Sequence, residues 1–117
     1  MAGNAAEERK GRLRADLKEA LKHGLKAEVS LIRALLAAID NAEAPPRTDE
    51  ELRAMRHDNA KACEIERLDL SSEQLDRLLA GECDARAEAA TGLDRRGQSD
   101  MADALRAEAA AIRRYLG

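Results

Sequence analysis

Residues 12–44 read RLRADLKEALKHGLKAEVSLIRALLAAIDNAEA, and this stretch decides the fold. In its first half a leucine recurs at every fourth position, at Leu13, Leu17 and Leu21. Its second half spaces apolar residues by three and four positions, at Val29, Ile32, Leu36 and Ile39. Apolar side chains at these spacings line one face of an α-helix. The stretch therefore predicts two consecutive amphipathic helices, over roughly residues 5–23 and 27–43.

The two predicted helices are joined by a very short link at Gly24. Glycine adopts a left-handed backbone conformation at little cost, so Gly24 is well placed to end the first helix. A link of a few residues allows only an antiparallel arrangement of its two helices. We therefore expect residues 5–43 to form a helical hairpin whose two apolar stripes face each other.

Two prolines mark the end of this hairpin. Pro45 and Pro46 lack the amide donor that a helix needs, and a proline also moves the residue before it out of the helical region. A linker over residues 44–70 is predicted to follow. Within it Thr48 and Glu51 form a T-x-x-E capping box, so the sequence leaves open whether the linker contains a further short helix.

Residues 71–117 are predicted to form a second pair of helices. Ser71 and Gln74 form an S-x-x-Q capping box, and the apolar face that follows extends a helix over roughly residues 72–91. Gly92 is placed to cap the end of this helix. After the turn LDRRGQSD, a last helix running nearly to the terminus is predicted by apolar residues that step by three and four, at Met101, Leu105, Ala109, Ile112 and Leu116.

The composition predicts an all-α fold. The chain has 117 residues, the length of one domain, and we treat residues 1–117 as a single unit. It contains 25 Ala and 16 Leu but only seven Val, Ile and Thr together, whereas strands favour β-branched and aromatic residues. We expect a small domain of four to five helices, in which the N-terminal antiparallel hairpin packs on the C-terminal helix pair. The expected core residues lie on the apolar stripes of their helices: Leu17, Leu21, Ile32, Leu36, Leu75, Leu79, Leu105 and Ile112.

Charge and hydropathy predict a cytoplasmic protein that does not enter a membrane. The 20 basic and 23 acidic side chains are interspersed and give a formal charge of −3, which is ordinary for a soluble protein. The longest apolar run, residues 34–39, is far shorter than the roughly 20 residues of a membrane helix. The N-terminal residues contain no apolar signal-peptide region. In the cytoplasm, Cys63 and Cys83 are expected to stay reduced thiols.

The sequence contains no recognisable catalytic or cofactor motif. It has neither a G-x-S-x-G nucleophile motif nor a Gly-rich phosphate loop. His23 lies at the end of the first predicted helix, where the helix dipole favours a cation, and His57 is expected to be solvated among charged neighbours. A zinc site built from the two His and two Cys residues lacks the closely spaced ligand pairs of structural sites. We therefore predict no catalytic residue, no cofactor and no metal.

One group of cations stands apart on the first hairpin. Successive members are four residues apart at Arg14, Lys18, Lys22 and Lys26, which predicts a basic stripe drifting slowly around the helix axis, and Arg12 and Arg33 extend it. Such a stripe neutralises phosphates, so the candidate nucleic-acid-binding residues are Arg14, Lys18, Lys22, Lys26 and Arg33. The alternative is a solvated helix face whose long side chains cover apolar surface.

Both halves of the chain resemble the YqeY-like proteins of the GatB/YqeY family. The first half carries the family's N-terminal signature in residues 12–44, including Asn41-Ala42-Glu43. Residues 70–116 resemble the later pattern: a Leu-Ser helix start, an Ala-rich helix, a Gly-containing turn and a helix that closes in Tyr115-Leu116. Family members continue past this point into another small helical module, and this chain, which ends at Gly117, is expected to lack it.

The resemblance implies an all-α module related to the tRNA-handling part of the GatB subunit of the tRNA-dependent amidotransferase. Family members carry the label of a carbon–nitrogen ligase with glutamine as nitrogen donor, and the resemblance implies tRNA or an amidotransferase-type protein as partner. Because no independent active site is recognised in the residues, we expect a non-catalytic accessory module that binds RNA or protein. The alternative is a helical protein–protein adaptor without a nucleic-acid role.

Overall fold

A computed structural model describes residues 5–44 and 68–116, which form four α-helices and no strand. The helices follow the chain in the order α1 (Ala5–Lys22), α2 (Lys26–Glu43), α5 (Ser72–Arg95) and α6 (Ser99–Arg113). The prediction of a small all-α domain is therefore confirmed. The capping box at Thr48 and Glu51, which left a further short helix open, lies outside the described residues, as do His57 and Cys63.

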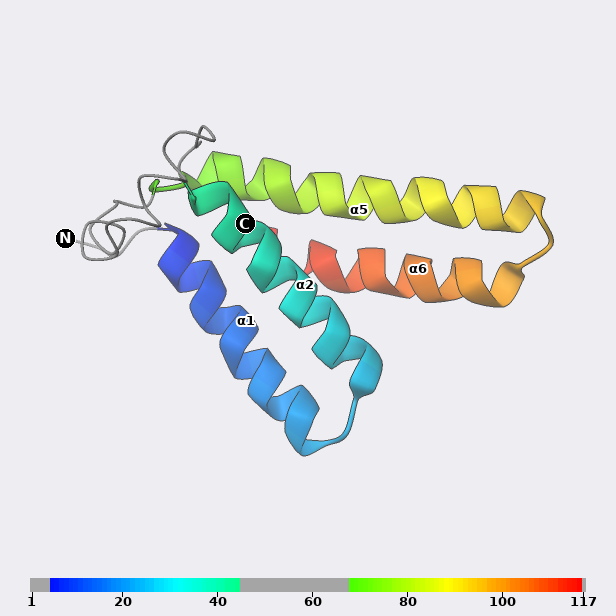
Figure 1. The fold of residues 1–117 in the computed structure, drawn as a ribbon, viewed down its shortest axis with the longest axis horizontal. Helices are drawn as coiled ribbons and strands as arrows, with labels where there is room; N and C mark the ends of the chain where they lie inside the picture. Colours follow the sequence, from blue (N-terminus) through cyan, green and yellow to red (C-terminus); the bar gives the residue numbers. More distant parts are fainter. Residues whose placement is uncertain (1–4, 45–67, 117) are drawn as a thin grey trace, which may run out of the picture.

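The helices are arranged as two hairpins that meet at one end (Figure 1). One hairpin pairs α1 with α2, and the other pairs α5 with α6. The turn of the first hairpin and the turn of the second lie far apart, because the hairpins diverge from their common end (Figure 1). Each hairpin therefore exposes its turn.

A glycine in the left-handed region ends α1, as the sequence predicted. Gly24 has a φ of 68°, and its amide donates to the carbonyl of Leu21 at 3.3 Å. The amide of Leu25 donates to the carbonyl of Ala20 at 2.9 Å, which completes a Schellman motif. The link between α1 and α2 is thereby set by local hydrogen bonds.

The second hairpin starts where its capping box predicts and turns later than expected. The amide of Gln74 donates to Ser71 Oγ at 3.1 Å, and the amide of Ser71 donates to Gln74 Oε1 at 2.8 Å. The prediction that Gly92 caps this helix is wrong, since α5 continues to Arg95. Gly97, with a φ of 76°, is the residue that ends it, and the Gln98 amide donates to the Leu93 carbonyl at 2.9 Å in a second Schellman motif.

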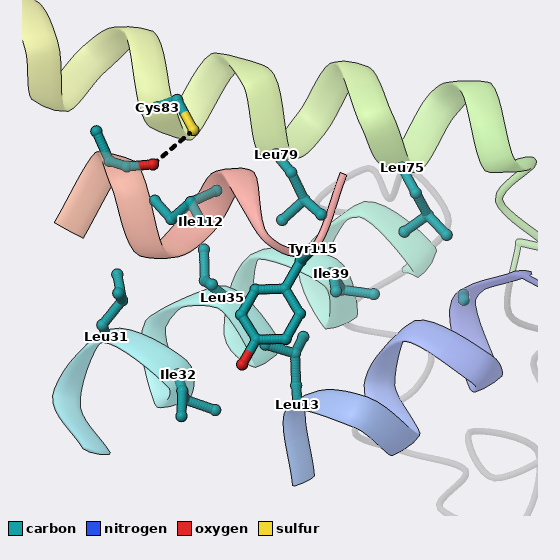
Figure 2. Close-up of a cluster of buried hydrophobic side chains, with 12 residues drawn as sticks. Leu13, Leu31, Ile32, Leu35, Ile39, Leu75, Leu79, Cys83, Ile112 and Tyr115 are labelled. Carbon is teal, nitrogen blue, oxygen red and sulfur yellow. Dashed lines mark hydrogen bonds between the residues drawn. The ribbon is translucent and has the colours of Figure 1, made fainter. Parts of the chain in front are cut away.

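All four helices contribute to one aliphatic core at the common end of the hairpins (Figure 2). The largest fully buried side chains are Leu13, Leu35, Ile39, Leu75, Leu79 and Ile112. Tyr115, just after α6, is also buried and points into this cluster (Figure 2). The core therefore lies where the end of α6 meets α1, α2 and the first half of α5.

The side chains predicted to form the core differ in how deeply they are buried. Four of them are buried: Ile32, Leu75, Leu79 and Ile112. Three are partly buried: Leu17, Leu36 and Leu105. The prediction for Leu21 is wrong, because its side chain is 53% exposed. A step of four residues rotates a helical position by about 40°, so the stripe that starts at buried Leu13 has turned away from the core by Leu21.

Ion pairs with buried cations join α1 to its neighbours. Arg9 reaches Asp76 on α5 at 2.9 Å, and Lys10 reaches Glu43 on α2 at 2.8 Å. Burial by itself lowers the pKa of Lys10, but hydrogen bonds to Glu43 and Glu7 outweigh it and raise the pKa above its ordinary value. These contacts show which sides of α1 face α5 and α2.

Candidate nucleic-acid interface

All five predicted nucleic-acid-binding residues are exposed on the first hairpin. Three belong to α1 and two to α2: Arg14, Lys18, Lys22, Lys26 and Arg33. None of them forms an ion pair within residues 5–44 and 68–116. Their charges are therefore not neutralised by the described part of the protein.

The contacts of α1 place its cations towards the outer side of the hairpin. Leu13 and Arg9 face the core and α5, whereas Lys10 faces α2. Arg14 and Lys18 are four and eight residues after Lys10, so they are rotated by about 40° and 80° from the side that faces α2, in the direction away from the core. Their exposure agrees with this placement.

The cations of α2 lie on the same outer side of the hairpin. Leu35 and Ile39 of α2 are buried in the core. Lys26 and Arg33 are seven residues apart, which brings them to one face of the helix about two turns apart, and this face is opposite the core. Ser30 lies between them on that face and is exposed.

A hollow lies between the two helices on this outer side. It has a volume of about 330 Å³ and is lined by Leu21, Gly24, Lys26, Val29, Ser30 and Arg33. Two cations, one hydroxyl group and two apolar side chains thus line it, and no carboxylate does. We call it the outer hollow.

A second hollow of about 320 Å³ lies on the opposite side of the α1–α2 turn, against the end of α6. It is lined by three carboxylates, from Asp16, Glu19 and Glu28. Apolar wall residues include Leu31 and Tyr115. Arg12 and Arg114 are in the same lining, so acidic side chains outnumber the arginines by one. We call it the inner hollow.

Arg12 belongs to the inner hollow and not to the outer basic face. Its guanidinium carbon lies 5.3 Å from the centre of the Tyr115 ring, and Nη2 donates to the Arg114 carbonyl at 2.9 Å. The prediction that Arg12 extends the basic stripe is therefore wrong. The physical reason is that Arg12 lies on the side of α1 that meets the end of α6.

Tyr115 is the inner residue that sequence reasoning missed. Its hydroxyl donates a hydrogen bond to the Asp16 carboxylate on α1. Burial and this hydrogen bond, together with the charge of Asp16, raise the pKa of Tyr115 well above its ordinary value. The signals in the sequence were that it is the single aromatic residue of the chain and that it belongs to the closing pair Tyr115-Leu116.

The residues considered for other chemistry do not gather into a site within the described ranges. His23 is exposed, and its Nε2 lies 3.5 Å from Glu19 Oε1. Cys83 is a free, buried thiol that donates a hydrogen bond to the Ala109 carbonyl, and burial raises its pKa. In residues 5–44 and 68–116 no group of His, Cys, Asp and Glu side chains is arranged to hold a metal ion.

Two further findings concern membrane-spanning helices and similarity to known proteins. Among the described helices, none has the length and apolar character needed to cross a membrane. Comparison of the chain with protein-family models, with curated proteins and with solved structures finds no match.

Proposed function

We propose that this chain is a non-catalytic RNA-binding module that contacts phosphates through the outer face of its α1–α2 hairpin. The observation that carries the proposal is that five exposed cations lie on that face, and that two of them, Lys26 and Arg33, line a hollow with no carboxylate in its lining. Lysine and arginine side chains that neutralise phosphates release condensed counterions, which drives binding to RNA.

The charge distribution around the hairpin supports the outer face over the inner one. The inner hollow has three carboxylates in its lining, whereas the outer hollow has none. The inner lining also contains Arg12 and Arg114, so its carboxylates outnumber its arginines by only one, whereas the charged side chains of the outer lining are all basic. A polyanion is therefore attracted more strongly to the outer hollow. With a net charge of −3 for the whole chain, binding depends on this local face.

The resemblance to the YqeY-like proteins favours tRNA as the RNA. It implies a module that holds tRNA while other domains carry out the chemistry. An amidotransferase-type protein is the corresponding protein partner in this proposal.

A helical protein–protein adaptor is the second candidate function. It is favoured by Leu21 and Leu25, which are 53% and 45% exposed at the α1–α2 turn. Leu21 lines the outer hollow and Leu25 the inner one, so each side of the turn offers one exposed apolar side chain to a protein partner. The two candidates differ in their response to salt and to charge reversal.

The test is binding of purified tRNA to the full chain, measured by fluorescence anisotropy over a series of salt concentrations. We expect an affinity in about the micromolar range or weaker, because a few phosphate contacts give only the non-specific electrostatic contribution. With four or five contacts, the logarithm of the affinity is expected to fall with the logarithm of salt at a slope of about −3 to −4.

Charge reversal locates the interface. Lys18→Glu with Lys22→Glu is expected to abolish binding, since both side chains are exposed on the outer face. The matched control is Arg77→Glu with Arg95→Glu, which makes the same change of charge at exposed positions of α5. Circular dichroism checks that both variants stay helical. Equal binding by the two double variants, or no binding by the wild type at low salt, would refute the RNA proposal and leave the adaptor.

A further inference from the structure

The outer hollow has features that simple charge neutralisation does not need. Phosphates are neutralised by exposed cations on any convex face, but here the lining of the hollow combines two cations with two apolar side chains, Leu21 and Val29. Its volume of about 330 Å³ falls at the lower end of the range of small-molecule sites. A hollow of this kind accepts a group that has both an anionic and an apolar part.

We infer that the outer hollow receives one unpaired nucleotide of the bound RNA, an inference that rests on the proposed function. In this arrangement Lys26 binds the phosphate of the nucleotide, and the guanidinium of Arg33 stacks on its base. The sugar and the base also contact the apolar side chains of Leu21 and Val29. Lysine suits a phosphate as a compact point charge, and the planar guanidinium of arginine stacks on a base.

The spacing of the polar groups fits such a ligand. Lys26 and Arg33 are seven residues apart, so their backbone positions are separated by about 10 Å along α2. Ser30 lies between them and lines the hollow. Its hydroxyl is both a donor and an acceptor, which allows a hydrogen bond to a ribose hydroxyl or to a base edge.

The hollow favours an unpaired nucleotide over a base-paired one. In a duplex the bases are stacked inside, and a protein surface meets mainly phosphates and ribose hydroxyl groups. Only an unstacked nucleotide, at a loop, a bulge or a free end, can place its base against Leu21 and Val29. The inner hollow is similar in volume, but its three carboxylates outnumber its two arginines, which makes it less favourable for a phosphate-bearing ligand.

The first measurement compares a single-stranded RNA oligonucleotide with a blunt-ended RNA duplex of the same length. A duplex carries the higher charge density, so binding by charge alone favours the duplex. If the hollow takes an unpaired nucleotide, the single strand is expected to bind more tightly by about fivefold, because contacts with one base, including stacking of the Arg33 guanidinium, add to charge neutralisation. Equal affinities, or tighter binding of the duplex, would overturn the inference.

The second measurement fills the hollow without changing charge. Ser30→Leu places a larger side chain into the lining and keeps a good helix former at an exposed position. It is expected to weaken single-strand binding by about fivefold and to leave duplex binding unchanged. Ala37→Leu is the matched control, because Ala37 is exposed on the same face of α2 but outside the hollow.

The outcomes separate this inference from the proposed function. Salt-dependent RNA binding that requires Lys18 and Lys22, combined with identical behaviour of Ser30→Leu and Ala37→Leu, would overturn the nucleotide site and retain the RNA-binding face. Absence of any RNA binding would overturn both. Thermal unfolding of both leucine variants shows whether the helix is intact.

Discussion

The hydroxyl group of Tyr115 donates a hydrogen bond to the carboxylate of Asp16, which joins the end of the second hairpin to α1 across 99 residues of sequence. Arg12 covers the same ring and also donates to the Arg114 carbonyl. Tyr115 thus contributes an apolar ring to the core and a polar contact at its edge. This contact links the two hairpins at the end opposite the α5–α6 turn.

Replacing Tyr115 by phenylalanine is expected to change the dependence of stability on high pH. The pKa of Tyr115 is raised in the folded protein, so the unfolded chain loses its phenolic proton first as the pH rises. The stability that this hydrogen bond contributes is therefore fully present below a pH of about 10, the ordinary tyrosine value, and is lost above it. Wild type should lose more stability than Tyr115→Phe over that range.

Urea unfolding at a series of pH values measures this difference. Near neutral pH the phenylalanine variant is expected to be less stable by about 1 kcal/mol, the usual net value of one hydrogen bond. Lys10 also has a raised pKa and loses its proton at high pH, but it is common to both proteins and cancels in the comparison. Parallel pH curves for the two proteins would show that Tyr115 titrates as an ordinary surface tyrosine.

Two aliphatic side chains of equal size are expected to differ sharply when truncated. Ile112 is fully buried, whereas Leu21 is 53% exposed. Ile112→Ala should reduce the free energy of unfolding by about 2 to 5 kcal/mol, since it leaves a cavity in the core. Leu21→Ala should cost less than about 1 kcal/mol, because little apolar surface returns to water. Chemical denaturation gives both values, and similar costs would show that the core is assigned to the wrong face of α1.

Alanine substitution at two glycines of the second hairpin is expected to change the stability of the protein in opposite directions. Gly97 has a φ of 76°, where a Cβ is strained, so Gly97→Ala should destabilise the protein by about 1 to 2 kcal/mol. Gly92 lies inside α5, and a Cβ there meets only the end of the Arg96 side chain at 3.9 Å. Gly92→Ala should stabilise the protein by about 0.5 to 1 kcal/mol. A higher melting temperature for Gly97→Ala than for Gly92→Ala would contradict the position of the turn.

The thiol of Cys83 is expected to react slowly in the folded protein. Burial raises its pKa, and the side chain is 4% exposed and donates to the Ala109 carbonyl. In a Cys63→Ser variant, which leaves one thiol, a maleimide reagent should modify Cys83 at least about tenfold faster in denaturant than in buffer. A fast native reaction would show that α5 and α6 separate readily at this position.

The boundaries of the helices depended on interactions within a few residues, and most of them could be predicted. The Ser71–Gln74 capping box and the turn at Gly24 were both anticipated and both occur. Gly92 was assigned the role that Gly97 holds, because two glycines followed the same apolar stripe and local pattern did not distinguish them. The exposure of the five cations also followed from their spacing on the helix surface.

The sequence by itself determined that this protein is built of amphipathic helices with an aliphatic core. The reason is that residue composition and the spacing of apolar residues are properties of each helical segment on its own. Only the tertiary structure decided which members of a stripe are covered, as the exposure of Leu21 shows. It likewise placed Arg12 against Tyr115 and left Lys26 and Arg33 around an open hollow. These outcomes depend on how the two hairpins meet, and that is set by contacts between residues far apart in the chain, such as Asp16 and Tyr115, which no local pattern encodes.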